Sequence, residues 1–381
     1  MSGERPIAFS TPHITEDDID AVTRVLRRGW LTTGDECLGL EEELAAYLDI
    51  DHVVTMSSCT AALETAMAFL ALPPGARVGV PTWTFVSSAL APVHSGAQPV
   101  LLDIEEDSLN LSVASLDAAL AEGLDALVLV HFGGVPAADE IRDRCAAFDV
   151  PVVEDCAHAL GASDGRGLLA GRGTAGACFS FYATKNLTSG EGGALATDDE
   201  RLADFARSFR LHGLSRDAWA RYRPGAGSGY DLMAPGIKGN LSDVLAALAR
   251  SHLGRYAELQ GRRRELVVRY RSNLAAVEGL RCVPGEMSDG AADHLMVVVL
   301  PETAQRGQVT GRLNDAGVAT SVHFQPLHQF DWFRKNTVTG PGGTRVADDL
   351  AKRVLSLPLH PGLDVADVDR ICESLANALA G

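Results

Sequence analysis

The sequence predicts an α/β fold with a large lobe built on a mostly parallel sheet and a smaller C-terminal α/β lobe. Short, almost continuously apolar segments alternate with segments of helical periodicity through the first part of the chain. This alternation is typical of parallel strands that helices cover on both faces. A similar alternation resumes from Leu295 onward, and 381 residues suffice for two lobes. We therefore expect a large lobe over residues 1–245 and a small lobe over 246–381.

The first expected element of the large lobe is a helix that Thr15 caps and Gly29 ends. Acidic residues fill its first turn, and apolar side chains recur on one face from Ile19 to Leu26. Apolar segments then predict strands over 52–56, 77–81, 98–103, 124–131, 151–155 and 178–182. Helices are expected between these strands, among them 136–148 and 201–210.

The C-terminal part predicts a long helix followed by a second series of strands and helices. Residues 242–273 are expected to form one helix that leaves the large lobe. The later elements are expected to be a strand over 295–300, a helix through Asn314, a strand over 318–322 and a helix over 365–379. Residues 211–240, in contrast, are polar and glycine-rich, and so long an irregular segment is uncommon unless it is functional.

Composition excludes several classes of partner. The net charge of −17 argues against nucleic acid and against an anionic membrane surface. The chain has no apolar run long enough to span a bilayer, and from its first residues we expect no secretory signal. Its seven cysteines are scattered without a CxxC pair, which is typical of buried thiols in a reducing cytoplasm. No HExxH motif or Cys/His cluster occurs, so we expect no metal site.

Lys185 is the first candidate for catalysis. It follows an apolar, β-prone run and precedes a glycine-rich reversal, within the stretch ACFSFYATKNLTSGEGGALA. A lysine at the end of a buried strand is partly desolvated, which lowers its pKa and favours a neutral amine that can attack a carbonyl. Most lysines are solvated surface charges. The assignment therefore depends on the residues upstream.

Those upstream residues supply a carboxylate. An apolar strand ends in Glu154 and Asp155, with His158 three positions further on. Open α/β sheets place ligand-binding groups at the carboxyl ends of strands, although an Asp there is equally well explained as a cap. A reactive lysine and a buried carboxylate together match the needs of pyridoxal phosphate. This cofactor requires an amine for covalent binding and an anion that keeps its pyridine nitrogen protonated.

Two further segments could hold such a cofactor. Ser57 to Leu63 opens a helix after a strand, and its hydroxyls and amides could bind a phosphate, although ordinary capping explains them too. Thr82 to Phe85 follows the next strand, and either Phe85 or Trp83 could stack on the pyridine ring or belong to the core.

Four separated motifs resemble the DegT/DnrJ/EryC1/StrS family of pyridoxal-phosphate sugar aminotransferases. They are VPTWTFVSSALAPVHSGAQPVLLDI, EDCAHALGA, FSFYATKNLTSGEGG and SVHFQPLH, and the match runs from about Phe9 to the C-terminus. The resemblance implies a fold-type I, aspartate-aminotransferase-like protein with a mostly parallel seven-stranded sheet. It also implies a homodimer with shared active sites, L-glutamate as amino donor and a nucleotide-linked keto sugar as acceptor.

The resemblance also assigns roles to individual residues. Lys185 would bind the cofactor and move the proton, Asp155 would pair with the pyridine nitrogen, and His158 would lie near the ring. The phosphate and ring contacts would be Ser58, Cys59, Thr60, Ser180, Phe85 and, across the dimer interface, Asn240. The family usually has glycine where Cys59 stands. The substrate contacts would be Trp30, Thr32, Arg216, Lys238, His323 and His328.

The identity of the sugar stays open at this point. The segment HGLSRDAW resembles members that aminate C4, which favours a dTDP- or UDP-linked 4-keto-6-deoxyhexose and a 4-amino-4,6-dideoxy product. A 3-keto sugar nucleotide or a keto-cyclitol of the scyllo-inosose type is the alternative. A dehydrating branch of the family typically replaces the lysine with histidine, and Lys185 argues against it. A protein that keeps the fold as a scaffold without turnover is the alternative of another class.

Overall fold

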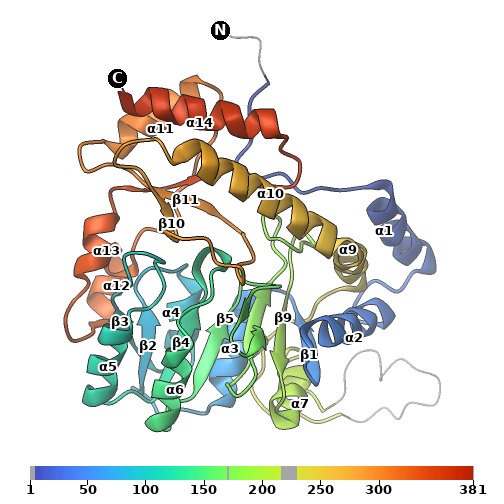
Figure 1. Ribbon diagram of the computed structural model, residues 1–381. Coiled ribbons are helices and arrows are strands. Elements are labelled where there is room, and N and C mark those ends of the chain that lie inside the picture. Colours follow the sequence, from blue (N-terminus) through green and yellow to red (C-terminus); the bar gives the residue numbers. More distant parts are fainter. Residues whose placement is uncertain (1–4, 170, 216–229, 381) are drawn as a thin grey trace.

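A computed structural model describes residues 5–169, 171–215 and 230–380 of the chain. The large lobe lies below and the small lobe above in Figure 1. Arg216 of the polar segment lies outside the described residues, so its predicted substrate role stays a prediction.

An eight-stranded sheet forms the centre of the large lobe, in the order β1-β9-β8-β5-β4-β2-β3-β12. Its strands are β1 (His52–Met56), β2 (Arg77–Pro81), β3 (Gln98–Leu102), β4 (Ala126–Val130), β5 (Val152–Asp155), β8 (Ala177–Ser180), β9 (Gly193–Thr197) and β12 (Val338–Thr339). Only β9 runs antiparallel to its neighbours; the other pairs are parallel. The seven strands of the large lobe match the expected sheet, and β12 adds a short strand from the C-terminal part.

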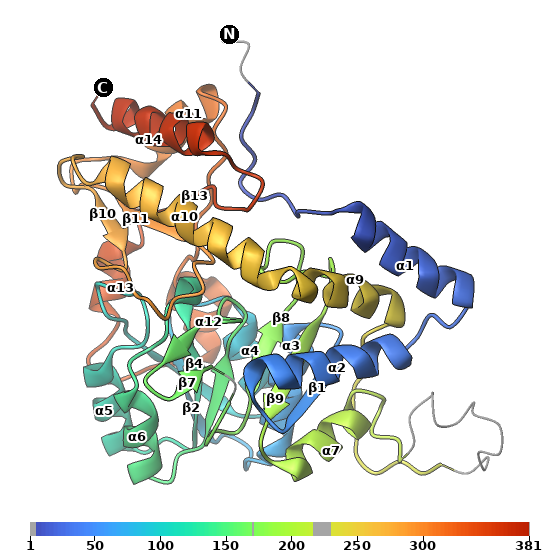
Figure 2. The same cartoon turned by 45° about the vertical axis from the view of Figure 1, so that its right-hand side comes forward.

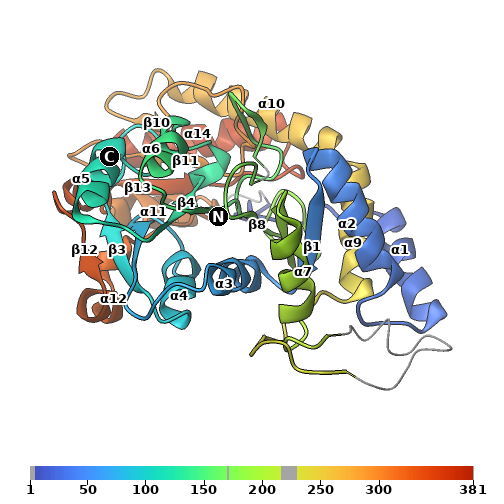
Figure 3. The same ribbon diagram turned by 90° about the horizontal axis from the view of Figure 1, so that it is seen from below.

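Helices cover both faces of this sheet, as the apolar strands predicted. Buried side chains of α3 (Cys59–Phe69), α4 (Ser87–His94) and α7 (Glu200–Phe209) pack on one face. Those of α2 (Asp35–Leu48), α5 (Val113–Glu122) and α6 (Glu140–Ala147) pack on the other. Figure 3, seen from below, shows α3 and α4 on the side of the sheet opposite to α5 and α6.

The small lobe has its own sheet and core. Strands β10 (Arg281–Val283), β11 (Met296–Val299) and β13 (Val354–Leu357) form an antiparallel sheet in the order β10-β11-β13. Helices α10 (Tyr256–Leu274), α11 (Arg306–Asp315) and α14 (Val365–Ala380) share its core. Helix α13 (Arg345–Leu350) packs where the two lobes meet, and α12 (Asp331–Asn336) buries Phe333 in the core of the large lobe. The expected strand over 318–322 is wrong. Val318 and Ser321 form only isolated bridges, to Ile7 and Ser356, so no ladder develops.

The expected single helix over 242–273 is two helices. Helix α9 (Asp243–Gly254) and helix α10 meet at Arg255, whose backbone angles (φ −111°, ψ 7°) interrupt the helix. Figure 2 shows both running across the large lobe toward the small lobe, with α1 (Glu16–Arg28) and α2 beside α9. The guanidinium of Arg255 binds Asp18 of α1 at 2.6 Å, so a tertiary contact holds the break.

Helix α1 has the predicted ends, but its apolar face is only partly covered. Thr15 and Asp18 form a capping box, and Gly29 ends the helix with φ 81°. Val25 is buried, whereas Ile19 and Leu26 are 50% and 54% exposed. None of the helices in the described part of the chain combines the length and apolarity needed to cross a bilayer.

Candidate active site

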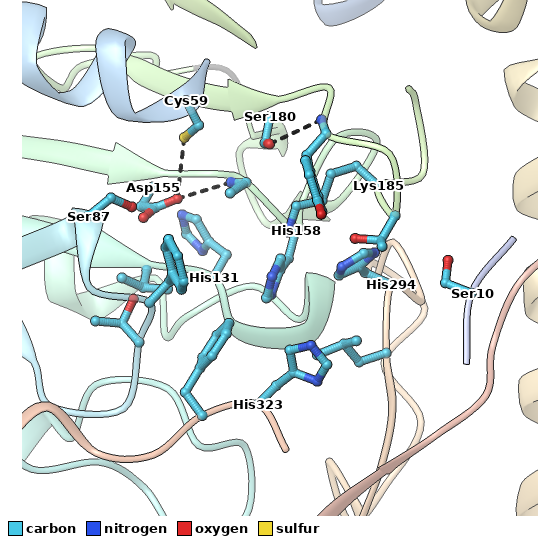
Figure 4. Close-up of a pocket in the computed structure, with 18 of the residues that line it drawn as sticks. Ser10, Cys59, Ser87, His131, Asp155, His158, Ser180, Lys185, His294 and His323 are labelled. Carbon is cyan, nitrogen blue, oxygen red and sulfur yellow. Dashed lines mark hydrogen bonds between the residues drawn. The ribbon is translucent and has the colours of Figure 1, made fainter. Parts of the chain in front are cut away.

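A cavity of about 390 Å³ opens at the carboxyl ends of β4, β5 and β8. This edge of a parallel sheet is where α/β proteins bind ligands. The small lobe contributes His294 and Phe324 to its wall, and the N-terminal segment contributes Phe9 and Ser10. Residues singled out from the sequence line it as well: Ser58, Cys59, Thr60, Phe85, Asp155, His158, Ser180, Lys185 and His323. Figure 4 shows how side chains from distant segments converge there.

Lys185 lies in the loop after β8 and reaches into this cavity. Its backbone N–H donates to the Tyr182 carbonyl at 2.9 Å, which closes a turn. Burial lowers the pKa of the Lys185 ammonium from 10.5 to about 8, although the Asp155 carboxylate acts in the opposite direction. Part of the amine is therefore neutral near physiological pH, and the neutral amine is the nucleophilic form.

Asp155 ends β5 and is 5% exposed. Its Oδ2 accepts a hydrogen bond from Ser88 Oγ at 2.7 Å, and its Oδ1 accepts one from the Ala157 backbone N–H at 3.1 Å. Thr84 Oγ1 lies 2.7 Å from Ser88 Oγ and extends this chain of hydroxyls. Asp155 thus makes the local bond expected of a cap and also faces the cavity, so the two interpretations of the sequence are compatible.

The side chain of Cys59 points toward Asp155. Its thiol donates to the Cys178 carbonyl at 3.3 Å and lies 3.7 Å from Asp155 Oδ1. Burial raises the pKa of this thiol well above 9.0, so it stays a protonated donor. Cys59 stands where the family usually has glycine. Its thiol therefore adds a neutral donor beside the Asp155 carboxylate.

The N-terminus of α3 borders the cavity next to Ser180. Ser58 caps this helix, because its Oγ accepts from the Ala61 N–H at 3.1 Å. The hydroxyl groups of Ser58, Thr60 and Ser180 line the cavity beside the helix end, an arrangement that suits an anion such as a phosphate. Gly193 of β9 packs so closely here that a Cβ would lie 2.5 Å from the Ser58 carbonyl carbon.

Aromatic rings form one part of the cavity wall. The Phe85 ring is 54% exposed and lies 5.9 Å from the Phe324 ring, which in turn stacks on His158 at 5.8 Å. Burial lowers the pKa of His158 well below 6.5, so its ring is neutral. Trp83, the other stacking candidate, is fully buried and donates its Nε1–H to the His323 carbonyl at 3.1 Å. Phe85 is therefore the ring that the cavity leaves available.

The two histidines of the late motif have different positions. His323 lines the cavity, where its Nδ1 lies 3.0 Å from Ser356 Oγ and its ring stacks on Phe9 at 5.4 Å. Burial, with the charge of Lys185, lowers the pKa of His323 to about 4. His328 does not line the cavity. Its ring nitrogens lie 2.7 Å from Thr82 Oγ1 and 2.9 Å from Asp348 Oδ1, so it links the lobes.

Four other predicted residues also lie outside the cavity of this chain. Trp30 donates its Nε1–H to the Thr33 carbonyl at 3.0 Å, and the Thr32 carbonyl accepts from the Asp243 N–H at 3.3 Å. Lys238 donates to Asn240 Oδ1, whose amide donates to Thr33 Oγ1 at 2.8 Å. The structure contains one chain, so the predicted contact of Asn240 with the partner subunit's cofactor stays a prediction.

Several residues of the cavity or its support were missed from the sequence: Thr84, Ser88, His131, His294 and Phe324. Thr84 and Ser88 stand inside one of the quoted motifs, so attention to hydroxyls around Phe85 could have found them. No signal marked His131 or His294.

His131, which lines the cavity, lies close to Glu154 and Cys156, with one potential metal ligand each within 4.8 Å of one another. Glu154 Oε1 already accepts a hydrogen bond from Arg142 Nε at 2.5 Å, and Arg142 also binds Asp164 at 2.6 Å. The positively charged guanidinium of Arg142 therefore already occupies the side of Glu154 on which a metal ion would bind.

The cavity fits pyridoxal phosphate on the evidence of its own residues. An amine of lowered pKa and an almost fully buried carboxylate share one cavity. A helix N-terminus with hydroxyls borders it, and an exposed phenyl ring stands at its wall. These groups match in turn the aldehyde, the pyridine nitrogen, the phosphate and the ring of the cofactor.

Comparisons with known proteins agree with this geometry. The chain is 37% identical, over 98% of its length and 97% of the relative's, to the spore coat polysaccharide biosynthesis protein SpsC of Bacillus subtilis. The pyridoxal-phosphate form of the putative sugar aminotransferase Spr1654 from Streptococcus pneumoniae superposes with a TM-score of 0.89 at 29% identity, covering 98% and 99% of the two chains. Helicobacter pylori PseC, an aminotransferase of pseudoaminic acid biosynthesis, gives 0.91 at 25% identity, covering 99% and 100%.

The DegT/DnrJ/EryC1/StrS aminotransferase family matches residues 12–376, almost the whole chain. Together with the full-length relatives and the fold-type I architecture, this match settles the class of the protein. The chain belongs to the DegT/DnrJ/EryC1/StrS family and is a pyridoxal-phosphate-dependent sugar aminotransferase.

Proposed function

We propose that this enzyme transfers the amino group of L-glutamate to a nucleotide-linked 4-keto-6-deoxyhexose. The product is a 4-amino-4,6-dideoxy sugar nucleotide for natural-product or surface-glycan biosynthesis. The observation that carries the proposal is the presence of the Lys185 amine and the Asp155 carboxylate in one cavity that two lobes line. Relatives named for spore coat polysaccharide and pseudoaminic acid biosynthesis support a surface-glycan sugar.

The roles of the residues follow from their surroundings. When bound, the cofactor supplies an aldehyde that captures amines and a protonated ring that withdraws electrons. Asp155 holds the proton at the pyridine nitrogen, because Ser88 and Ala157 keep its carboxylate oriented. Lys185 takes the proton from the α-carbon of the donor and returns it on the acceptor side, which a pKa of about 8 permits.

The cavity favours a sugar next to the ring. Its wall includes aromatic rings, with Phe9 stacked on His323 and Phe324 near Phe85, and such faces pack against the C–H groups of a pyranose. Among the described residues that line it, Lys185 is the only lysine or arginine. The diphosphate of the nucleotide would therefore extend out of the cavity toward exposed basic groups such as Lys238.

The homodimer is part of the same proposal. Apolar side chains of 40% exposure or more gather on and around α1 and α2: Ile14, Ile19, Leu26, Leu31 and Leu38. Covering such a surface favours association with another chain. In a homodimer with shared active sites, Asn240 would contact the partner subunit's cofactor phosphate from a position that Thr33 and Lys238 hold.

The test offers the purified enzyme a panel of acceptors with ¹⁵N-labelled glutamate. The panel holds dTDP- and UDP-linked 4-keto-6-deoxyhexoses, the matching 3-keto sugars and scyllo-inosose. We expect label in an amino group at C4 of a nucleotide-linked product, identified by mass and NMR. Amination of a 3-keto sugar or of scyllo-inosose instead would overturn the substrate assignment. The Lys185→Ala variant is the control for non-enzymatic transfer of the amino group.

A further inference from the structure

Two imidazole rings lie against each other in the wall of the cavity, one from each lobe. His158 follows β5 of the large lobe, and His294 precedes β11 of the small lobe. Their ring centroids are 4.4 Å apart with 39° between the planes. Both side chains line the cavity and are buried, at 8% and 5% exposure. Figure 4 shows them on the same side of the cavity as Lys185.

Hydrogen bonds define which nitrogen of each ring carries the proton. The Gly133 backbone N–H donates to His158 Nδ1 at 3.2 Å, so neutral His158 carries its proton on Nε2. Asn186 uses its amide N–H groups on the Ala292 carbonyl at 2.6 Å and on Gln260 Oε1 at 2.9 Å. Its Oδ1 therefore accepts from His294 Nδ1, 2.9 Å away, and the proton of His294 is on Nδ1.

The backbone of one turn connects the two rings. Gly133 donates to His158 and accepts from the His294 backbone N–H at 3.0 Å. The next residue, Gly134, has φ 86°, and a Cβ there would lie 2.8 Å from the His158 carbonyl oxygen. The turn can therefore approach both residues only because it consists of glycine.

His294 thus contacts two residues of the proposed cofactor site at once. Its ring packs on His158, and its Nδ1–H binds Asn186, the neighbour of Lys185 in the chain. We propose that His294 is a positioning residue: its ring keeps Nδ1 of His158 facing the Gly133 N–H, and thereby keeps His158 in its Nε2–H form, while its bond to Asn186 anchors the Lys185 loop to the small lobe. This proposal rests on the assignment of His158 and Lys185 to the cofactor site.

Three variants separate this role from a general loosening of the lobes. His294→Ala removes the ring and the donor. His294→Asn keeps a donor for Asn186 and lacks the ring, and it serves if the alanine variant does not fold. Gln260→Leu is the matched control, because Gln260 binds Ala292 and Asn186 at the same junction but is not part of the cavity wall.

The first readout is the tautomer of His158, measured by ¹⁵N NMR of histidine-labelled protein without cofactor. The second is the affinity for pyridoxal phosphate, measured by fluorescence titration. We expect both His294 variants to lose the pure Nε2–H signature of His158. His294→Ala should also bind the cofactor about tenfold more weakly, the scale of one lost buried hydrogen bond. Gln260→Leu should keep the signature and an affinity within about twofold of the wild type.

An unchanged His158 signature and unchanged affinity in both His294 variants would overturn the proposal, as would equal losses in Gln260→Leu. Failure of the substrate assignment gives a different pattern. The wild-type enzyme would then bind the cofactor and aminate none of the 4-keto sugars, while the tautomer measurement, made on protein without cofactor, keeps its expected result.

Discussion

Ser88 donates a hydrogen bond from Oγ to Asp155 Oδ2 at 2.7 Å, and both side chains are almost completely buried. The donor lies in the first turn of α4 and the acceptor ends β5, so the bond ties a helix on one face of the sheet to the strand edge that carries the site. A carboxylate held in this way needs no rearrangement to pair with a pyridine nitrogen.

Ser88→Ala should therefore weaken cofactor binding. Removal of a hydrogen bond to a charged group costs about 1.5–3 kcal/mol, so we expect the Kd for pyridoxal phosphate to rise about tenfold or more. Fluorescence titration measures this directly. Thr84→Val is the graded control, because Thr84 reaches Asp155 only through Ser88, and its effect should be smaller. Equal Kd values for wild type and Ser88→Ala would refute the role of this bond.

The reactivity of Lys185 should depend on pH with a midpoint near 8. Only the neutral amine reacts with an aldehyde, and burial lowers the pKa of Lys185 from 10.5 to about 8. Pulse labelling of cofactor-free protein with formaldehyde and a hydride donor, read by peptide mass spectrometry, gives the rate at each pH. The exposed Lys335 and Lys352 are internal controls for the effect of pH on the reagents themselves.

The same labelling tests the part played by Asp155. Its carboxylate raises the pKa of Lys185 against the effect of burial, so Asp155→Asn should lower the midpoint below 8. A midpoint that moves upward, or that does not move, would show that the carboxylate does not act on the amine.

His323 and His328 should behave differently when each is replaced by alanine. His323 lines the cavity, so His323→Ala should raise the KM for the keto sugar about tenfold, the scale of one lost contact. His328 bonds Thr82 and Asp348, so His328→Ala should lower the free energy of unfolding by about 1–3 kcal/mol and leave KM within about twofold. Steady-state kinetics and urea unfolding separate the two, and a larger KM effect in His328→Ala would contradict these positions.

The buried ion network around Arg142 should matter for stability. Arg142 binds Glu154 at 2.5 Å and Asp164 at 2.6 Å, and all three side chains are buried. Arg142→Met leaves two buried carboxylates without their cation, so we expect a loss of about 3–5 kcal/mol in the free energy of unfolding. Adding Glu154→Gln should recover part of the loss. A single variant as stable as the wild type in urea unfolding would contradict the network.

The strands could be predicted because their local signals agree with the tertiary structure. Short apolar runs between turn residues gave β1 and β2 with their observed ends, and Thr15 and Gly29 marked the ends of α1. The break at Arg255 was missed because the bond of this residue to Asp18 comes from a helix far away in sequence, although Gly254 was a usable signal.

The site residues, too, divide into those that local sequence predicts and those that depend on tertiary contacts. Lys185 and Asp155 were found because one follows and the other ends an apolar strand, and the carboxyl ends of these two strands lie at the same edge of the sheet. His294 was missed, and His328 was expected in the cavity but lies outside it. Their positions depend on how the small lobe packs on the large one, and the sequence of a single segment does not indicate that packing.

The most direct test of the account is borohydride reduction of the enzyme loaded with pyridoxal phosphate, followed by peptide mass spectrometry. The chain has four lysines, and Lys238, Lys335 and Lys352 are exposed, so the attachment site can be assigned without ambiguity. We expect the phosphopyridoxyl group on Lys185 alone. Its attachment to one of the exposed lysines, or no attachment at all, would contradict the proposed site.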